Sequence, residues 1–213
     1  MTHKHSDYMH WAKTGSKATF NLATSGVGPF PLRDLPFDYS TLEINGANSY
    51  GYPPLLQAIA QQYGVDPEGV VTRRGHVDGE LSGDGDAARR RGRSGDRAPA
   101  YGLLVDAAQY IGAEVKRFAR REENDYAIDP AEVRRMVTPK TKLIVVTNLH
   151  NPSSVVTPDA VLREVADIAR SVGARLLVDE VYLDAVYENT PSTARSNRAG
   201  SARHQQSYQG VRA

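Results

Sequence analysis

Several features that would assign a protein to a special class are missing from this sequence. It has no cysteine, and 26 lysines and arginines nearly balance 25 aspartates and glutamates, giving a formal net charge of +1. This balance provides no overall attraction to nucleic acid or to an anionic membrane. No apolar run is long enough to span a bilayer, and residues 1–6 lack the apolar core of a signal peptide. We therefore expect a cytoplasmic protein with no nucleic-acid or membrane partner, which the absence of cysteine permits.

Large apolar residues are also almost absent from one internal segment, residues 73–99, where arginine, glycine and aspartate predominate. Such a segment cannot bury enough surface to offset the entropy lost on ordering, so we expect it to be disordered. Its arginine cluster is also typical of an arm that binds an anionic partner. The rest of the 213 residues, of which 40% are hydrophobic overall, suffices for one sizeable core but is small for two complete domains.

Helical and strand patterns alternate outside this segment. Apolar spacing, proline at helix starts and glycine at helix ends predict helices over 53–63, 102–110, 130–136 and 158–172, and apolar runs predict strands over 113–118, 142–148 and 176–178. Strands that alternate with helices at this length are typical of a doubly wound, mostly parallel sheet. The sequence therefore predicts an α/β protein.

Two predicted strands run directly into polar side chains. Leu176, Leu177 and Val178 precede Asp179, Glu180 and Tyr182, and the strand over 142–148 leads to Asn151 and Pro152. The carboxyl ends of parallel strands are where open α/β sheets bind ligands. A carboxylate and a phenol there suit the ring nitrogen and the ring oxygen of a flat heteroaromatic cofactor. Taken alone, Leu176–Tyr182 is equally typical of an ordinary buried strand that ends in solvated acids.

The two stretches in this order, with a capped helix between them, resemble the pyridoxal-phosphate aminotransferases of fold type I, class I/II. The resemblance covers residues 8–72 and 100–195. It implies amino-group transfer between an amino acid and a 2-oxo acid, pyridoxal 5'-phosphate as cofactor and a homodimer. It also implies that residues 1–28 are an N-terminal arm and that residues 29–195 are an incomplete cofactor-binding large domain, interrupted by residues 73–99.

The resemblance also assigns roles to single residues. Asp179 would pair with the pyridinium nitrogen and keep it protonated, which makes the ring an electron sink. Asn151 and Tyr182 would donate hydrogen bonds to the phenolic oxygen of the ring, and Tyr101 would stack on its face. Gly26 would meet the substrate carboxylate through its backbone. From the residues alone, Tyr101 is also typical of a helix entry and Gly26 of a simple turn.

Two parts of the family's machinery are missing. The small-residue turn that would hold the phosphate at a helix N-terminus should follow Thr72, where the arginine- and glycine-rich run stands instead. The lysine that forms the Schiff base should follow Tyr182 within a few dozen residues, and no lysine occurs after Lys142. We therefore expect this chain to be inactive. A non-enzymatic role, in which the arginine-rich segment binds an anionic partner, remains the alternative.

The genetic code offers an explanation for both losses. His204–Ala213 can be encoded as CAC CAA CAG TCT TAC CAA GGC GTA CGG GCT, which read one base later gives T-N-S-L-T-K-A-Y-G-L, the family's lysine motif. His76–Arg89 can be encoded so that the same shift gives T-S-M-A-N-Y-L-A-M-A-T-L-L, a phosphate-binding turn and its helix. We therefore expect a truncated aminotransferase sequence with compensated frameshifts around residues 73–99 and a disordered, frameshifted tail over 196–213.

Overall fold

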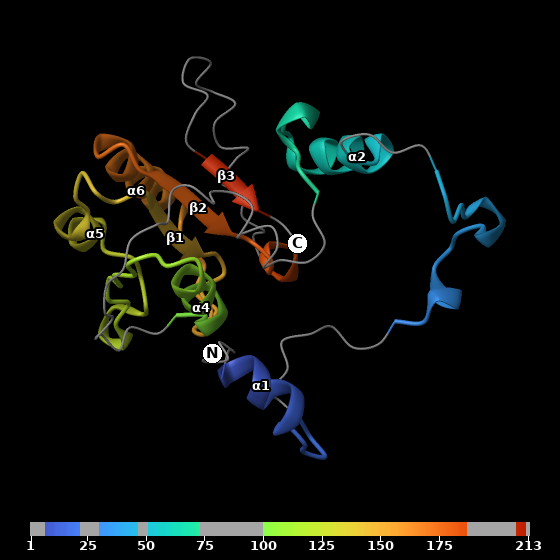
Figure 1. Cartoon of the computed structure of the whole chain (residues 1–213), viewed down its shortest axis with the longest axis horizontal. Helices are drawn as coiled ribbons and strands as arrows, with labels where there is room; N and C mark the ends of the chain where they lie inside the picture. The colour runs from blue at the N-terminus through green and yellow to red at the C-terminus, as the bar shows by residue number, and fades with distance from the viewer. Residues whose placement is uncertain (1–6, 22–29, 47–50, 73–99, 187–207, 212–213) are drawn as a thin grey trace.

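The computed structural model describes residues 7–21, 30–46, 51–72, 100–186 and 208–211. Its centre is a parallel sheet in the order β1-β2-β3, formed by β1 (Leu143–Thr147), β2 (Arg175–Asp179) and β3 (Tyr208–Val211) (Figure 1). The pairing places Leu143 beside Arg175 and Thr147 beside Asp179. The predicted α/β class with a parallel sheet is therefore confirmed, and the carboxyl ends of β1 and β2 lie at the same edge.

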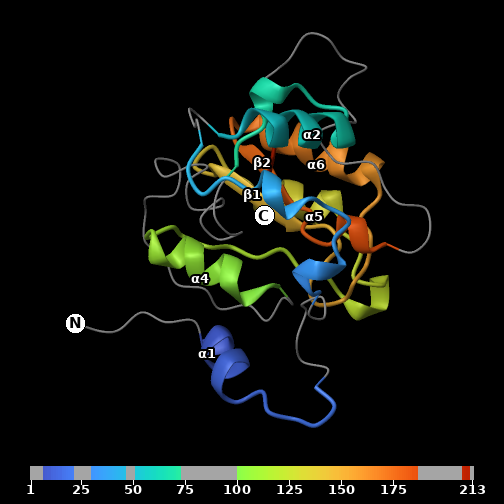
Figure 2. The same cartoon turned by 90° about the vertical axis from the view of Figure 1, so that its right-hand side faces the viewer.

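Helix α6 (Asp159–Ser171) connects β1 to β2 and covers one face of the sheet (Figure 2). Its apolar residues recur every three or four positions, so they form one stripe that faces the strands. Val165 and Ala169 are fully buried in this stripe, and Gly173 ends the helix region with a φ of +73°. Glycine adopts this left-handed backbone without steric cost.

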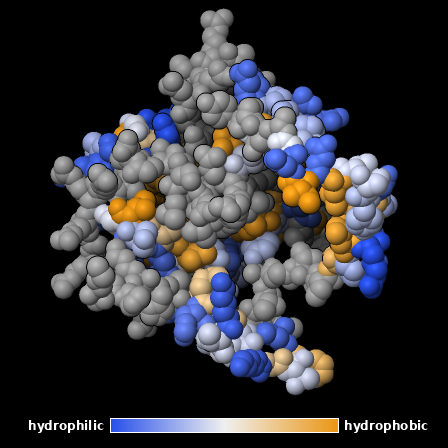
Figure 3. Space-filling model, turned by 45° about the vertical axis from the view of Figure 1, so that its right-hand side comes forward, coloured by the Kyte–Doolittle hydropathy of each residue, from blue (hydrophilic) through white to orange (hydrophobic). Residues whose placement is uncertain are grey.

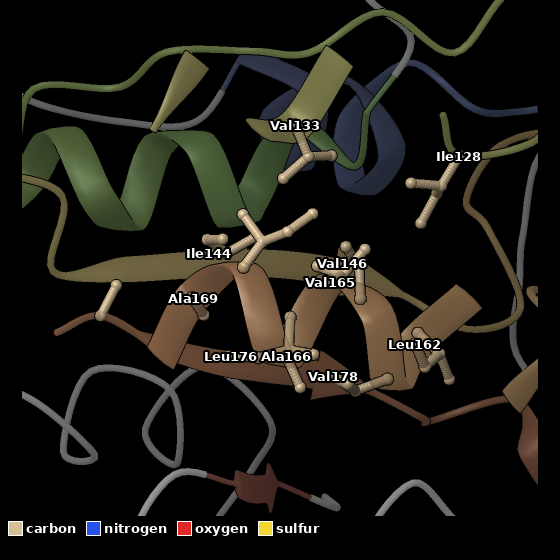
Figure 4. Packing of buried hydrophobic residues seen from close by; sticks show 12 residues of the cluster. Ile128, Val133, Ile144, Val146, Leu162, Val165, Ala166, Ala169, Leu176 and Val178 are labelled. Atoms are coloured by element: carbon tan, nitrogen blue, oxygen red, sulfur yellow. The ribbon is translucent and has the colours of Figure 1, made fainter. Parts of the chain in front are cut away.

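The core forms where α6 and α5 (Pro130–Met136) meet β1 and β2 (Figure 4). Its buried members are Ile128, Val133, Ile144, Val146, Leu162, Val165, Ala166, Ile168, Ala169, Ala174, Leu176 and Val178. The opposite face of β1 is less covered: Val145, which points away from the core side chains of its neighbours, is 37% exposed. On β2, Leu177 is buried as well, as expected for a strand covered on both faces.

The remaining helices lie outside this unit (Figure 1). Helix α2 (Pro53–Tyr63) begins with two prolines and ends at Gly64, as its sequence predicts, and its Tyr63 hydroxyl donates a hydrogen bond to Asp184 Oδ2 over 2.9 Å. Helix α4 (Gly102–Tyr110) lies beside α1 (Asp7–Thr14), a helix that the sequence analysis did not predict inside the N-terminal arm. Within the described ranges, no helix combines the length and apolar character needed to cross a membrane.

Two segments differ from their predicted structure. Residues 113–118 do not form a strand, and the segment is held instead through Ala119 N, which donates to Glu132 Oε1 of α5 over 2.8 Å. Residues 208–211 form β3, although disorder was predicted for the whole tail 196–213. The pairing satisfies backbone groups of β2 that a free sheet edge would leave open. The predicted disorder over 73–99 falls outside the described residues.

Apolar side chains are exposed along residues 30–44. Phe30, Leu32, Leu42 and Ile44 expose 67%, 58%, 61% and 107% of their reference areas. Apolar groups are also visible between polar ones on the face that Figure 3 shows. The apolar residues of 30–44 therefore contribute little to the core formed by α5, α6 and the sheet.

Candidate functional site

The candidate site lies at the carboxyl edge of β1 and β2. Thr147 and Asp179 end these strands side by side, and the backbone N–H of Asn148 donates to the Asp179 carbonyl over 2.7 Å. The loops after both strands therefore start from one point. Because Asn151 follows β1 by four residues and Tyr182 follows β2 by three, the fold brings these two predicted cofactor residues to the same edge as Asp179.

Asp179 has the burial expected of a carboxylate that holds a protonated nitrogen. Its residue is 3% exposed, and its Oδ1 accepts a hydrogen bond from Val181 N over 3.2 Å. The following residue, Glu180, is 1% exposed, and its carbonyl accepts from Leu183 N over 2.9 Å. These bonds turn the chain sharply after β2 and place Tyr182, which is half-buried, directly after the two acids.

The loop over 148–157 carries Asn151 and is tied at both ends. Asn148 Oδ1 accepts from Thr157 N over 2.9 Å, which closes the base of the loop. Inside it, the His150 N–H donates to the Val155 carbonyl, and Asn151 N donates to Thr147 Oγ1 over 3.0 Å. Asn151 is therefore held through its backbone, while its side chain is half-buried.

Several buried polar residues near the site were not predicted from sequence. His150 is 4% exposed, its Nδ1 lies 2.6 Å from Ser153 Oγ, and its ring lies 6.2 Å from that of Tyr126. Asn148 Nδ2 is buried and has no hydrogen-bond partner within the described structure. The sequence did contain one signal for their burial: Asn148 and His150 lie between a strand predicted to be buried and the predicted site residue Asn151.

Arg120 is a further buried polar residue that was not predicted from sequence. Its guanidinium is buried: Nε donates to the Tyr126 carbonyl over 2.6 Å, and one terminal nitrogen donates to Thr157 Oγ1 over 3.4 Å. Burial lowers the pKa of Arg120 to about 10. No sequence signal distinguished this arginine, because Arg117 and Arg121 flank it in the same polar stretch.

Of the other two predicted site residues, only Tyr101 belongs to the described part of the chain. Tyr101 precedes α4, is half-buried, and packs edge-on against Tyr8 of α1 with ring centroids 6.1 Å apart and an interplanar angle of 80°. Tyr101 thus takes part in the contact between α1 and α4. Gly26, the predicted substrate contact, falls outside the described residues.

The donors at the strand ends fit the ring of pyridoxal 5'-phosphate. A ring N–H needs a buried carboxylate, which Asp179 provides, and a phenolic oxygen needs N–H or O–H donors, which Asn151 and Tyr182 can supply. The orphaned Nδ2 of Asn148 adds an unused donor at the same edge. The segment predicted to have replaced the phosphate-binding turn, residues 73–99, lies outside the described structure.

Comparison with known proteins agrees with this chemistry. The sequence model of the aminotransferase class I and II family matches residues 45–207. A probable aspartate/prephenate aminotransferase of Thermus aquaticus is 34% identical over 91 residues, 43% of this chain and 24% of the relative. An aspartate aminotransferase of Pyrococcus horikoshii is 27% identical over 145 residues, 65% of this chain and 37% of the relative.

Solved structures show the same likeness. Alanine aminotransferase from Pyrococcus furiosus superimposes with a TM-score of 0.59 at 26% identity, over 71% of this chain and 41% of that protein. In each of these comparisons the chain spans less than half the length of the protein that it matches.

Proposed function

This chain belongs to the aminotransferase class I and II family, and we propose that its folded part is the ring-binding half of a pyridoxal-phosphate site for amino-group transfer between an amino acid and a 2-oxo acid. The observation that carries the proposal is the buried carboxylate of Asp179, which ends β2 beside Thr147 of β1. Asp179 would hold a proton at the pyridinium nitrogen, and Asn151 and Tyr182 would donate to the phenolic oxygen. The ring contact of Tyr101 stays a prediction, because the structure places Tyr101 against the ring of Tyr8.

Pyridoxal phosphate, when bound, supplies an electron sink for a substrate carbanion. The chain's own residues bind and orient the ring. Because Asp179 is 3% exposed, water would compete little with its carboxylate for the ring N–H. The backbone N–H of Asn151 donates to Thr147 Oγ1, and this hydrogen bond fixes the position from which the side-chain amide of Asn151 extends.

A direct test is equilibrium dialysis of the full chain against pyridoxal 5'-phosphate. Asp179→Asn keeps the side-chain size but removes the charge, so we expect the affinity to fall about tenfold or more, the usual weight of a charge-assisted hydrogen bond. Glu114→Gln, which changes an exposed acid away from the strand ends, is the matched control and should bind as the parent does. Equal affinity of Asp179→Asn and the parent would contradict the proposed ring site.

We further propose that these 213 residues do not transaminate, since no lysine follows Lys142. An amine nucleophile is what covalent catalysis at such a site requires. The proposed cause is a shift of the reading frame. The shifted lysine codon overlaps the codon of Gln209. Gln209 lies in β3 and pairs with Leu177 of β2. This pairing supports the proposal that the tail derives from a strand next to the site.

Sequencing the coding DNA across codons 70–100 and from codon 195 onward tests the frameshift. Codons that give the lost motifs when offset by one base support it. Codons that cannot yield a lysine at the position of Gln209 contradict it. The homodimer and the cytoplasmic location belong to the same proposal, as properties expected of the intact enzyme.

The alternative is a non-enzymatic protein whose arginines in residues 73–99 bind an anionic partner. It predicts salt-sensitive retention of the chain on a nucleic-acid column, because such binding releases condensed counterions. Retention of this kind, together with no binding of pyridoxal phosphate, would favour the alternative over the ring site.

A further inference from the structure

Arg120 is a buried cation that faces neutral groups. Its residue is 5% exposed, and its two hydrogen bonds go to the Tyr126 carbonyl and the Thr157 hydroxyl. Within the described residues, Arg120 forms no ion pair with a carboxylate. Burying an unpaired charge is unfavourable. Burial of this guanidinium therefore lowers the stability of the folded chain. Its two hydrogen bonds identify the segments that it connects.

The two acceptors belong to different segments of the chain, 31 residues apart in the sequence. Tyr126 belongs to the turn before α5, and Thr157 ends the loop that begins at Asn148. Arg120 spans them with two nitrogens of one planar group, which a lysine cannot do. The guanidinium thus joins the base of the loop over 148–157 to a neighbouring segment.

From Thr157 the hydrogen bonds continue to the site. Thr157 N donates to Asn148 Oδ1 over 2.9 Å, and Asn148 N donates to the Asp179 carbonyl over 2.7 Å. Asn151 lies inside the loop that the first of these bonds closes. Outward movement of Thr157 would open this closure and leave the bond to Thr147 Oγ1 to hold Asn151 without it.

We propose that Arg120 is a positioning residue that fixes the 148–157 loop, through Thr157, so that Asn151 is presented to the cofactor ring beside Asp179. The inference rests on the proposed function for the part played by Asn151. The link from Arg120 to the loop does not depend on the cofactor, and it can be measured in the free chain.

Amide hydrogen exchange of the full chain without cofactor tests that link. Arg120→Met and Thr157→Val each remove one side of the contact, so the amides of His150, Asn151, Ser154 and Thr157 should exchange about tenfold faster or more, the effect of losing a hydrogen bond to a charged group. Thr157→Ser keeps the hydroxyl and should retain the parent's rates. Arg121→Met, at an exposed neighbour, is the matched control.

The pattern of exchange separates positioning from general stability. Acceleration confined to 148–157, with unchanged rates in β2, supports the proposal. An equal acceleration in β2 would mean that Arg120 only contributes to global stability and would overturn it. Unchanged rates in the loop of both Arg120→Met and Thr157→Val would also overturn it.

Dialysis against pyridoxal 5'-phosphate gives the second readout. The Thr157→Val chain should bind pyridoxal 5'-phosphate at least a few times more weakly than the Thr157→Ser chain. Equal affinities would overturn the claim that the loop presents Asn151 to the cofactor. If the parent chain retains no cofactor, the ring site of the proposed function fails, and the positioning of Asn151 for the ring fails with it. The exchange data then still decide whether Arg120 fixes the loop.

Discussion

At the residue scale, polar burial is concentrated around the carboxyl edge of β1 and β2. Among the described residues, the buried polar and charged ones are Arg120, Thr147, Asn148, His150, Thr157, Asp179 and Glu180. All of them lie in the ends of these strands, in the turns that follow, or in contact with those turns. The interior here is shaped by hydrogen bonds, whereas the space between α6 and the sheet is filled by apolar side chains.

The burial of Arg120 gives a prediction about pH. Burial lowers the pKa of Arg120 from its ordinary value to about 10 in the folded chain, so between about pH 10 and that ordinary value the unfolded chain binds more protons and stability rises with pH. Relative to Arg120→Met, the parent should gain about 1 kcal/mol in free energy of unfolding between about pH 8 and about pH 11. Urea titrations at both pH values measure this, and the comparison with Arg120→Met cancels other titrating groups. A constant difference between the two proteins would contradict the shifted pKa.

Asn148 should matter for stability through its side-chain oxygen. Asn148→Ala leaves the buried Thr157 N–H without its acceptor, so the free energy of unfolding should fall by about 1–3 kcal/mol. Asn124→Ala, at an exposed position in a turn, is the control and should change it by less than about 0.5 kcal/mol. Equal effects of the two substitutions in chemical denaturation would argue against the loop closure.

At the scale of elements, the sequence was most informative where local signals and burial agree. Helix α2 has two prolines at its start and a glycine in the left-handed region at its end, and α6 has a continuous apolar stripe, so both were predicted. Helix α1 was missed because none of its residues is buried and its apolar stripe of Tyr8, Trp11 and Ala12 spans little more than one turn. The strand predicted over 113–118 did not form, because a strand needs a neighbouring strand to pair with, and local sequence does not show whether one is present.

Only the site residues that directly follow a predicted strand could be predicted from the sequence. Asp179, Tyr182 and Asn151 follow apolar runs directly, and parallel pairing then places them at one edge. Arg120 is 59 residues before Asp179 in the chain and reaches the site only through Tyr126 and Thr157. Such a contact depends on tertiary packing, so no local sequence pattern could predict it.

Helix α6 should carry much of the stability of the folded unit. Leu162→Ala removes a side chain that is 2% exposed in the core, so it should lower the free energy of unfolding by about 2–5 kcal/mol. Arg163→Ala, one residue further on the exposed side, removes only an ion pair with Asp159 at 4.0 Å and should cost less than about 1 kcal/mol. Thermal or urea unfolding of both variants measures this, and similar losses would contradict the packing of α6 on the sheet.

At the scale of the whole molecule, the chain combines a well-packed β1–α6–β2 unit with a periphery that packs less. The face of β1 opposite α6 leaves Val145 partly exposed, and residues 30–44 expose large apolar side chains. In the comparisons above this chain spans less than half the length of each relative. We therefore expect marginal stability and a tendency to aggregate, which light scattering during purification would detect.

Restoring the shifted frame tests the whole-molecule proposal. A chain in which residues 76–99 and 204–213 are replaced by their translations one base later should unfold at a higher temperature. Borohydride should fix pyridoxal phosphate covalently to the lysine that then stands at position 209. The control is the same repaired chain with glutamine kept at that position, which should bind the cofactor only reversibly. Absence of fixation in the repaired chain would contradict the frameshift hypothesis.

The short span of the β1–α6–β2 unit has a consequence for how the protein is made. Its strands and helix all lie between Leu143 and Asp179, so their mutual contacts need no residue downstream of Asp179. Parallel pairing across a helical crossover forms more slowly than a hairpin, but N-terminal parts of a chain fold first during synthesis. The ribosome synthesises this unit before it reaches residue 196, where the proposed error in the tail begins. The nascent polypeptide can therefore bring Thr147 and Asp179 to one edge of the sheet whichever frame supplies the codons downstream.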